Sequence, residues 1–348
     1  MRVGVLTGGG DAPGLNAAIC GLGRRLLASG AELIGFEDGW RGAIEDRTRS
    51  LRDANFQHLL VYGGTLLGSS GDNPYKRAAE SVPKVLATLQ RHRLDALVAI
   101  GGEGTLGAAD RLHREHQVPV VGVPKTIDND LDATDFTFGF FSAVEVATRA
   151  MDDLRSTADS HGRIMVVECM GRHAGWITAY AGVAAGAEAI LVPERPVHLE
   201  ELCDKLQRLR ATGARSAIVA VAEGARVFEG GNCLSSTEKD EFGEWKTGGT
   251  AQIIAQRLQA LLSWDSRHLV LGHLQRAGKP IAFDRIFALR LGARAARLVL
   301  EKRFGYMAAM RAGEIVDVPL HAAVAARKVL GDQFLDRYET FFLPIGGP

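Results

Sequence analysis

Short apolar runs that do not alternate with polar residues recur along the chain, and longer amphipathic segments separate them. A strand that is buried on both faces has this continuous apolar character, whereas a strand with one solvent-exposed face alternates. Parallel strands joined by helices form a sheet that those helices cover on both sides. The sequence therefore predicts an α/β fold with two doubly wound, mostly parallel-sheet, Rossmann-like domains.

The 348 residues are enough for two such domains. The predicted strands are Val3–Leu6, Glu32–Phe36, Ala96–Ile100, Val120–Val123, Ile164–Cys169, Ala189–Val192, Ala217–Ala222 and His268–Leu271. The predicted helices carry apolar residues at helical spacing and are Gly14–Ala28, Tyr75–His92, Leu106–Glu115, Phe141–Arg155, Trp176–Gly186, Leu199–Leu209, Thr250–Leu262 and Phe283–Leu300.

Two segments interrupt this alternation. Residues 228–249 are rich in Gly, Glu, Lys and Ser, which predicts a mobile surface loop. Around Thr137–Arg155 a first set of strands ends and a second set begins, so we expect the domain boundary there.

Charge and composition narrow the class of protein. Lys and Arg together number 41, as do Asp and Glu, and this balance argues against a nucleic-acid or membrane-surface partner. The chain lacks an apolar run of the roughly 18 residues that a membrane span needs, and we expect no signal peptide because a strand follows Met1 and Arg2 directly. The four cysteines lie far apart, which predicts a reduced cytoplasmic protein without disulfides or a zinc site.

Two glycine-rich strings follow predicted strands and open predicted helices. Gly8–Gly14 follows the first strand, and Gly101–Thr105 follows the third. Glycines let backbone N–H groups approach a phosphate, and a helix N-terminus favours the anion. Gly8–Gly14 is neither a Walker A loop nor a dinucleotide fingerprint, and taken alone it also fits a structural turn. Glu103 is suited to Mg²⁺ at phosphates, although a carboxylate there also fits a helix cap.

The string Pro124–Asp130 follows the fourth predicted strand. Asp128 and Asp130 are two residues apart, so in extended backbone both point to one side. One carboxylate can position a metal or substrate while the other accepts a proton, which suits phosphoryl transfer. The alternative is an Asx-turn in which the carboxylates bond only to the backbone.

Cations and polar groups recur at predicted strand ends in the second half. Planar guanidinium groups at such positions suit a phosphorylated substrate. The residues concerned are Arg163, Met170, Gly171, Arg172, Glu223, Arg267, His273 and Arg276.

From Arg2 to about Arg311 the chain resembles the 6-phosphofructokinases of bacterial type. The resemblance rests on six strings in the expected order: Gly8–Gly14, Gly101–Thr105, Pro124–Asp130, Gly139-Phe140-Phe141, Met170–Arg172 and Gly272–Arg276. The second string is shared with other kinases, whereas Thr126–Asp130 is far more specific. The resemblance implies a glycolytic enzyme that phosphorylates fructose 6-phosphate at its 1-hydroxyl. It also implies a donor-binding domain over residues 1–140, a sugar-phosphate domain over 141–310, and a C-terminal segment, 311–348, that packs back on both.

The resemblance assigns roles to the residues of these strings. Asp128 would be the general base, Thr126 and Asp130 would orient the sugar or the transferring phosphoryl group, and Arg172 would stabilise its charge. Gly10, Glu103, Gly104 and Thr105 would hold the donor, with Mg²⁺ on Glu103, where the common bacterial pattern has an aspartate. Met170, Gly171 and Glu223 would contact the sugar, and its 6-phosphate would be held by Arg163, Arg267, His273 and Arg276.

Family members share active sites between subunits, because the residues that match Arg163 and Arg267 reach in from a neighbour. The resemblance therefore implies a homodimer or homotetramer. At the effector site of the common bacterial enzyme, Arg24, Arg155 and Glu188 match the family, whereas Cys20 replaces an arginine and Ala214 a lysine. We expect weak or absent effects of ADP and phosphoenolpyruvate, because lost cations weaken an anion site.

The family divides into users of ATP and users of pyrophosphate. Pyrophosphate users carry Asp at the position of Gly104, where a carboxylate repels the α-phosphate of ATP, and Lys at the position of Lys125. This chain has the glycine of one group and the lysine of the other. Because a missing side chain leaves room for a nucleotide whereas a lysine forbids nothing, we expect ATP as the donor. The alternatives are a pyrophosphate-dependent enzyme, with sedoheptulose 7-phosphate as a possible second acceptor, and a non-catalytic binding subunit.

Overall fold

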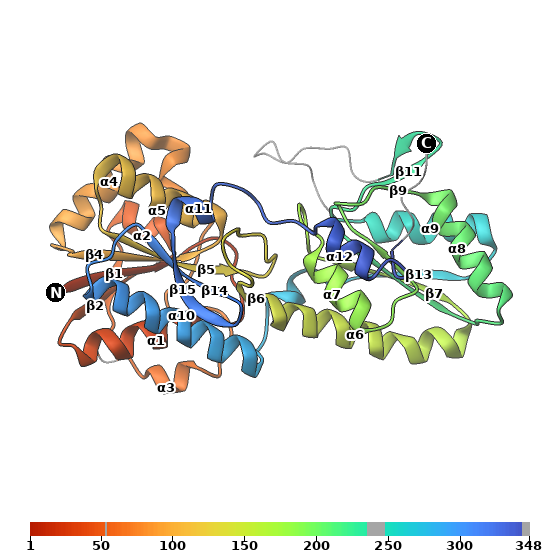
Figure 1. The fold of residues 1–348 in the computed structure, drawn as a ribbon, viewed down its shortest axis with the longest axis horizontal. Helices are drawn as coiled ribbons and strands as arrows, with labels where there is room; N and C mark the ends of the chain where they lie inside the picture. The colour runs from red at the N-terminus through yellow and green to blue at the C-terminus, as the bar shows by residue number, and fades with distance from the viewer. Residues whose placement is uncertain (53, 235–247, 343–348) are drawn as a thin grey trace. The chain divides into compact units, whose positions relative to one another are not determined.

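The computed structural model describes residues 1–52, 54–234 and 248–342. They form two compact units, and both are built from segments that are distant in sequence (Figure 1). The first unit comprises Met1–Ser142 and Arg276–Arg327, and the second comprises Ala143–Gln275 and Lys328–Pro348. The chain therefore passes between the units more than once.

The first unit is built on an eight-stranded sheet. Five neighbouring strands, in the order β14, β5, β4, β1 and β2, are parallel, and β15 and β3 add antiparallel edges. The short strand β6 pairs with the end of β5. In chain order the strands are β1 Arg2–Thr7, β2 Glu32–Phe36, β3 Thr48–Ser50, β4 Ala96–Gly101, β5 Val120–Thr126, β6 Phe138–Gly139, β14 Tyr306–Arg311 and β15 Glu314–Pro319.

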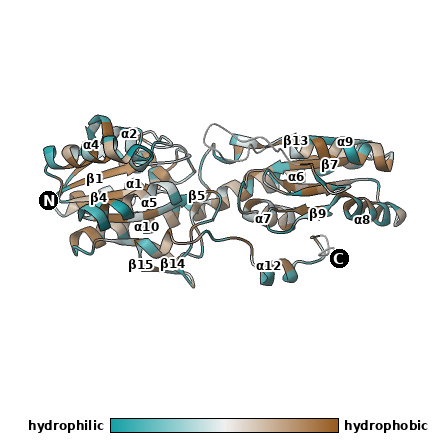
Figure 2. Ribbon diagram, turned by 90° about the horizontal axis from the view of Figure 1, so that it is seen from above, coloured by the Kyte–Doolittle hydropathy of each residue, from teal (hydrophilic) through white to brown (hydrophobic). Residues whose placement is uncertain are grey.

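Helices cover both faces of this sheet, and each face has its own apolar core. Strands β1, β4 and β5 contribute apolar residues to both cores, which explains their continuous apolar sequences. Figure 2 shows brown colour on these strands and teal on much of the helix surface. The helices of this unit are α1 Leu15–Ala28, α2 Trp40–Glu45, α3 Phe56–Leu59, α4 Ala78–Arg91, α5 Glu103–His116, α10 Ala282–Leu300 and α11 Leu320–Ala323.

The second unit is built on a parallel four-stranded sheet in the order β13, β7, β10 and β8. A small three-stranded sheet of β12, β11 and β9 accompanies it. Its strands are β7 Ile164–Cys169, β8 Ala189–Leu191, β9 Val197–His198, β10 Ala217–Ala222, β11 Val227–Glu229, β12 Asn232–Cys233 and β13 Ser266–Val270. Its helices are α7 Trp176–Ala184, α8 Leu199–Ala211, α9 Thr250–Leu262 and α12 Asp332–Arg337, while α6, Phe140–His161, begins in the first unit.

The predicted α/β class and its mostly parallel sheets are confirmed. The loop predicted over residues 228–249 begins instead with strands β11 and β12, and residues 235–247 lie outside the described residues. The hairpin of β14 and β15 is absent from the predicted elements. Its strand β14 joins the sheet beside β5, far away in sequence, and periodicity does not reveal such a pairing.

The structure divides the chain differently from the predicted ranges 1–140, 141–310 and 311–348. Residues 276–310 belong to the first unit, because α10 packs on α1 and β14 pairs with β5. Glycines let the two helices approach closely: a Cβ at Gly292 would lie 2.1 Å from the carbonyl oxygen of Ala18. Of the C-terminal segment, 311–327 belongs to the first unit and the remainder to the second. Within the described ranges, we find no helix that is both long enough and apolar enough to span a bilayer.

Candidate active site

The first unit has an open pocket of about 320 Å³. Residues that follow the strands β1, β4 and β5 line it. These strands are parallel neighbours, and ligands of open α/β sheets bind outside the carboxyl ends of such strands. The pocket brings together most residues that the sequence singled out for donor and chemistry. Its lining is Gly9, Gly10, Gly71, Asp72, Asn73, Lys76, Gly102, Glu103, Gly104, Thr105, Lys125, Thr126, Asp128, Asp130 and Arg276.

The two glycine-rich turns meet because the residues between them are small. A Cβ at Gly8 would lie 2.6 Å from Oγ1 of Thr105, and one at Gly101 would lie 2.4 Å from Cβ of the same threonine. Thr105 is buried between these turns, and the N–H of Gly8 donates to the carbonyl of Ile100 at 3.0 Å. The two turns therefore pack against each other, and Gly9, Gly10, Gly102 and Thr105 line the same pocket.

Lys125 lies buried beneath the first turn, with its Nζ donating to the carbonyl oxygen of Gly10. Burial, with a contribution from Arg276, lowers the pKa of this lysine to about 8. The guanidinium of Arg276 lies beside Gly10 as well, and its Nη1 donates to the carbonyl of Asp11 at 3.3 Å. Two cations thus lie at the floor of the pocket, where phosphate charge would be neutralised.

Side chains within the Thr126–Asp130 loop hold it in shape. Thr126 Oγ1 accepts a hydrogen bond from the Asp128 N–H at 3.1 Å. Asn129, in the left-handed region at φ 52°, accepts from the Thr137 N–H at 3.1 Å. The turn thus has a threonine and an asparagine as acceptors, while Asp128 and Asp130 line the pocket. Burial, followed by the charge of Asp128, raises the pKa of Asp130 to about 6, as expected for close carboxylates.

Glu103 begins α5, and its side chain is half exposed. Its Oε2 accepts from Nη2 of Arg327 at 2.8 Å, and Nε of Arg327 lies 3.7 Å from Oδ2 of Asp130. Arg327 was not predicted from the sequence; it follows α11 and lies at the site because it forms an antiparallel bridge with Leu131.

The carboxylates fit a magnesium ion that a phosphorylated donor brings with it. Among the described residues, no group of three or more His, Cys, Asp or Glu side chains could hold a metal by itself. Mg²⁺ in phosphoryl-transfer sites takes one or two carboxylates and fills its remaining positions with phosphate oxygens and water. Glu103, with Asp128 and Asp130 lining the same pocket, supplies donors of that chemistry.

Four further pocket residues were missed in the sequence: Gly71, Asp72, Asn73 and Lys76. Asn73 Nδ2 donates to the carbonyl of Gly104 at 3.1 Å and so ties this loop to α5. Asp72 pairs with Arg41 at 2.8 Å. The signal available was the Asn-Pro pair at 73–74, which marks a turn but indicates no ligand.

The remaining predicted residues lie in the second unit: Arg163, Met170, Gly171, Arg172, Glu223, Arg267 and His273. Arg163 and Arg267 both pair with Asp265, each at 2.5 Å. The Met170 N–H donates to Oε1 of Gln275 at 3.2 Å, and the Gly171 N–H to Oε1 of Glu223 at 3.5 Å. Arg163 and Arg267 thus lie close together through Asp265. Separately, the loop that contains Met170 and Gly171 contacts Glu223.

Of the residues considered for an effector site, Arg155 and Glu188 pair with each other, and Cys20 is buried. Nη1 of Arg155 donates to both carboxylate oxygens of Glu188, at 2.7 and 2.9 Å. Cys20 is fully buried, which raises the pKa of its thiol, whereas Arg24 is exposed. The replacement of an arginine by Cys20 therefore removes a cation and adds no polar group at the surface.

Comparisons with known proteins identify the family of this chain. Residues 2–299 match the family described as phosphofructokinase. The chain is 48% identical over 343 residues to the pyrophosphate–fructose 6-phosphate 1-phosphotransferase of Amycolatopsis methanolica, covering 98% of this chain and 100% of that relative. It is 45% identical over 344 residues to the ATP-dependent 6-phosphofructokinase of Mycobacterium tuberculosis, with the same coverage.

A solved structure extends the likeness to the fold. The phosphofructokinase of Pichia pastoris in the T-state superposes with a TM-score of 0.80 at 31% identity, over 93% of this chain and 35% of the yeast chain. This chain thus spans about a third of that yeast subunit. With a family match over most of its length and the relatives above, the chain belongs to the phosphofructokinase family.

Proposed function

We propose that this phosphofructokinase transfers the γ-phosphoryl group of ATP to the 1-hydroxyl of fructose 6-phosphate, as a cytoplasmic homo-oligomer of glycolysis. The observation that carries the choice of donor is the space around Gly104. Apart from its chain neighbours and the backbone of its own helix, no heavy atom of the described residues lies within 4 Å of the Cβ position at Gly104, which lines the pocket in the first turn of α5. That open space is room for the part of ATP that pyrophosphate lacks.

The chemistry follows from the residues of the pocket. Asp128 accepts the proton of the attacking hydroxyl, and a loose transition state makes small demands on its basicity. Asp130 and Thr126 orient the acceptor, and Arg172 stabilises the transferring charge. The N–H groups of the Gly10 and Thr105 turns hold donor phosphates at the start of α5. Glu103 would hold Mg²⁺, which neutralises phosphate charge when it is bound.

The acceptor side rests on the second unit. Met170, Gly171 and Glu223 contact the sugar, and Arg163, Arg267 and His273 hold its 6-phosphate through charge-assisted hydrogen bonds. Arg276 contacts the same phosphate in the family pattern, while its position beside Gly10 and Lys125 also suits the donor. The share of the active site that a neighbouring subunit supplies is Arg163 and Arg267.

Pyrophosphate is the second candidate donor, and Lys125 favours it. Its ammonium group is buried against Gly10, where it can neutralise a compact, highly charged donor without any nucleotide contact. The relative from Amycolatopsis methanolica carries a pyrophosphate-dependent name.

A donor comparison tests the proposal. Formation of fructose 1,6-bisphosphate is coupled to aldolase, and equal concentrations of ATP and pyrophosphate are supplied in parallel with Mg²⁺. We expect kcat/KM to be at least tenfold higher with ATP. Turnover with pyrophosphate alone would overturn the choice of donor, and turnover with neither would overturn the proposed reaction.

A further inference from the structure

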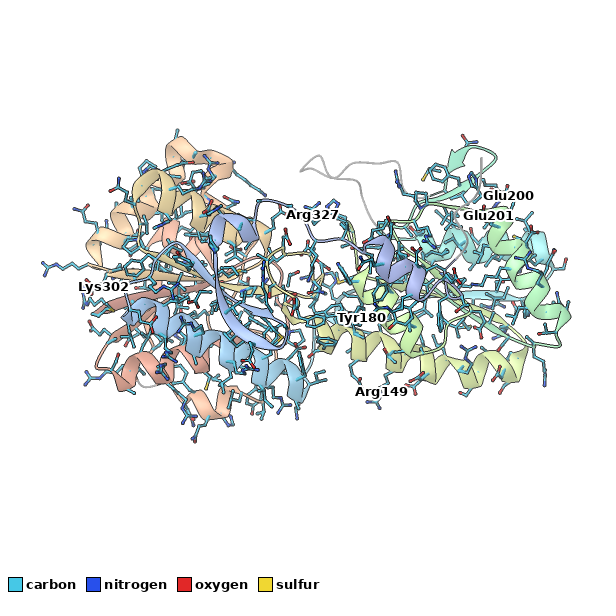
Figure 3. All side chains as sticks on the ribbon, in the orientation of Figure 1. Arg149, Tyr180, Glu200, Glu201, Lys302 and Arg327 are labelled. Atoms are coloured by element: carbon cyan, nitrogen blue, oxygen red, sulfur yellow. The ribbon has the colours of Figure 1, made fainter. Side chains whose placement is uncertain are left out.

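Arg327 occupies the oxygen atoms that a metal ion would use. Its guanidinium bridges Glu103, at 2.8 Å, and Asp130, at 3.7 Å, on the candidate active site of the first unit. Figure 3 labels this side chain on the segment that follows α11. Neither the family resemblance nor the sequence pattern assigns a role to it.

The backbone of Arg327 is fixed beside the acidic loop, whereas its side chain and that of Glu103 are exposed enough to separate. Arg327 forms an antiparallel bridge with Leu131, the residue after Asp130, and this bridge fixes its Cα beside the acidic loop. Its side chain, however, is 36% exposed, and that of Glu103 is 50% exposed. Exposed ion pairs are weak, so a competing cation can displace the guanidinium without moving the backbone.

Charge explains why a cation is needed there before any ligand binds. Glu103, Asp128 and Asp130 line one pocket, and the guanidinium of Arg327 lies against two of these three carboxylates. Carboxylates gathered in this way repel one another unless a cation lies between them. A divalent ion carried by the donor satisfies the same need with twice the charge.

We propose that Arg327 is a resident counter-cation, which holds Glu103 and Asp130 in the donor-free enzyme and is displaced by the divalent metal. The inference rests on the proposed role of Glu103 as the metal ligand. Once displaced, the guanidinium is free beside the donor phosphates, to which it can donate in bidentate geometry. When the metal takes Glu103 and Asp130, the same arginine thereby becomes available to bind the phosphates of the donor.

The test measures Mn²⁺ binding to the full-length enzyme without nucleotide, by water-proton relaxation. If Arg327 competes with the metal, its removal should strengthen Mn²⁺ binding. If Arg327 instead supports the position of Glu103, its removal should weaken Mn²⁺ binding. We expect Arg327→Gln to lower the Mn²⁺ dissociation constant about two- to fivefold, in keeping with the strength of an exposed pair. Arg327→Lys retains the positive charge and should stay near the parent value.

Two controls separate this inference from the proposed function. Arg2→Gln removes an arginine from an exposed pair with Glu32, outside the pocket lining, and should leave Mn²⁺ binding unchanged. Glu103→Gln should weaken binding and abolish the gain from Arg327→Gln in the double variant. If Glu103→Gln weakens binding but Arg327→Gln does not strengthen it, the counter-cation role is overturned alone. If Mn²⁺ binding is detectable but insensitive to Glu103→Gln, the metal role of Glu103 is overturned with it. Mn²⁺ binding that is undetectable in every variant would overturn displacement of Arg327 by the metal, because the metal would then need the donor phosphates to bind.

Discussion

At the scale of single residues, the choice of donor depends on one absent side chain. Gly104 and Gly107 both lie on α5, and among the described residues neither has a heavy atom within 4 Å of its Cβ position apart from chain neighbours and the backbone of α5. Only Gly104 lines the pocket. The two positions therefore allow the same substitution to be compared inside and outside the site.

Gly104→Asp should lower kcat/KM for ATP at least tenfold more than kcat/KM for pyrophosphate, because its carboxylate would face the α-phosphate. Steady-state kinetics with both donors measure the difference. Gly107→Asp is the matched control and should leave the donor ratio unchanged. Equal losses with both donors in Gly104→Asp would remove the steric argument for ATP.

Asp128→Asn tests the proposed base. The amide cannot accept the hydroxyl proton, so kcat should fall by about 10²–10⁴, the usual contribution of general-base catalysis, while KM for fructose 6-phosphate changes little. Asp132→Asn is the control, because Asp132 lies in the same loop but is exposed, and its Oδ1 accepts from the N–H of Ala133. An Asp128→Asn enzyme with more than a tenth of the parent turnover would place the base elsewhere.

Asp130 should lower stability in a pH-dependent way. Its pKa is raised from 3.8 to about 6, so the folded protein binds this proton more tightly than the unfolded chain does. The cost of ionised Asp130 therefore grows between about pH 4 and pH 6 and is complete above that range. Asp130→Asn should raise the free energy of unfolding by about 2–3 kcal/mol at pH 7.5 and by less at pH 5, as urea titrations would measure. A gain that is equal at both pH values would contradict this origin.

The residues of the site differ in how visible they were in the sequence. Gly101–Thr105 and Thr126–Asp130 could be predicted, because strand ends and helix starts place chemistry at defined positions. Arg327 could not be predicted, because it reaches the pocket only through a backbone bridge to Leu131, which is nearly two hundred residues earlier in the chain. Asp72 and Asn73 were missed because the Asn-Pro pair at 73–74 marks only a turn, and the contact of Asn73 with Gly104 that brings it to the pocket leaves no local pattern.

At the scale of elements, local periodicity predicted the strands well, because buried parallel strands have continuous apolar sequences. It could not predict which helix packs against which. The contact between α1 and α10 depends on glycines: a Cβ at Gly21 would lie 2.1 Å from the carbonyl oxygen of Leu289, and one at Gly292 2.1 Å from that of Ala18. This contact joins segments that are far apart in the chain into the unit that carries the candidate active site.

Gly292→Ala should therefore lower the free energy of unfolding by about 1–3 kcal/mol, because the helices must separate to admit one methyl group. Gly107→Ala, at an open helical position, should instead add up to about 1 kcal/mol through helix propensity. Urea unfolding followed by circular dichroism measures both. A stabilising Gly292→Ala would show that α1 and α10 do not pack this closely.

At the scale of the whole molecule, the sequence located a boundary near residue 140 but could not reveal that the chain returns to the first unit at Arg276. Without a structure, each domain is assumed to be one continuous segment of the chain. The pairing of β14 with β5 shows that the first unit is not. The same limit applies beyond one chain. Arg163 and Arg267 are joined through Asp265 in the second unit, and the family pattern gives them to the active site of a neighbouring subunit.

Mixing two inactive variants tests whether subunits share active sites. Asp128→Asn removes the base, and Arg267→Ala removes a phosphate ligand of the neighbour's site, so each homo-oligomer should be nearly inactive. In a hybrid dimer one site carries both defects and the other carries neither, because a two-fold interface exchanges equivalent residues. After the variants are co-refolded in equal amounts, half of the dimers are hybrids, and activity should reach about a quarter of the parent value. Separately refolded samples that are mixed afterwards are the control. Activity no greater than the sum of the two parent variants would mean that each active site belongs to a single chain, and that Arg267 binds the substrate within its own subunit or not at all.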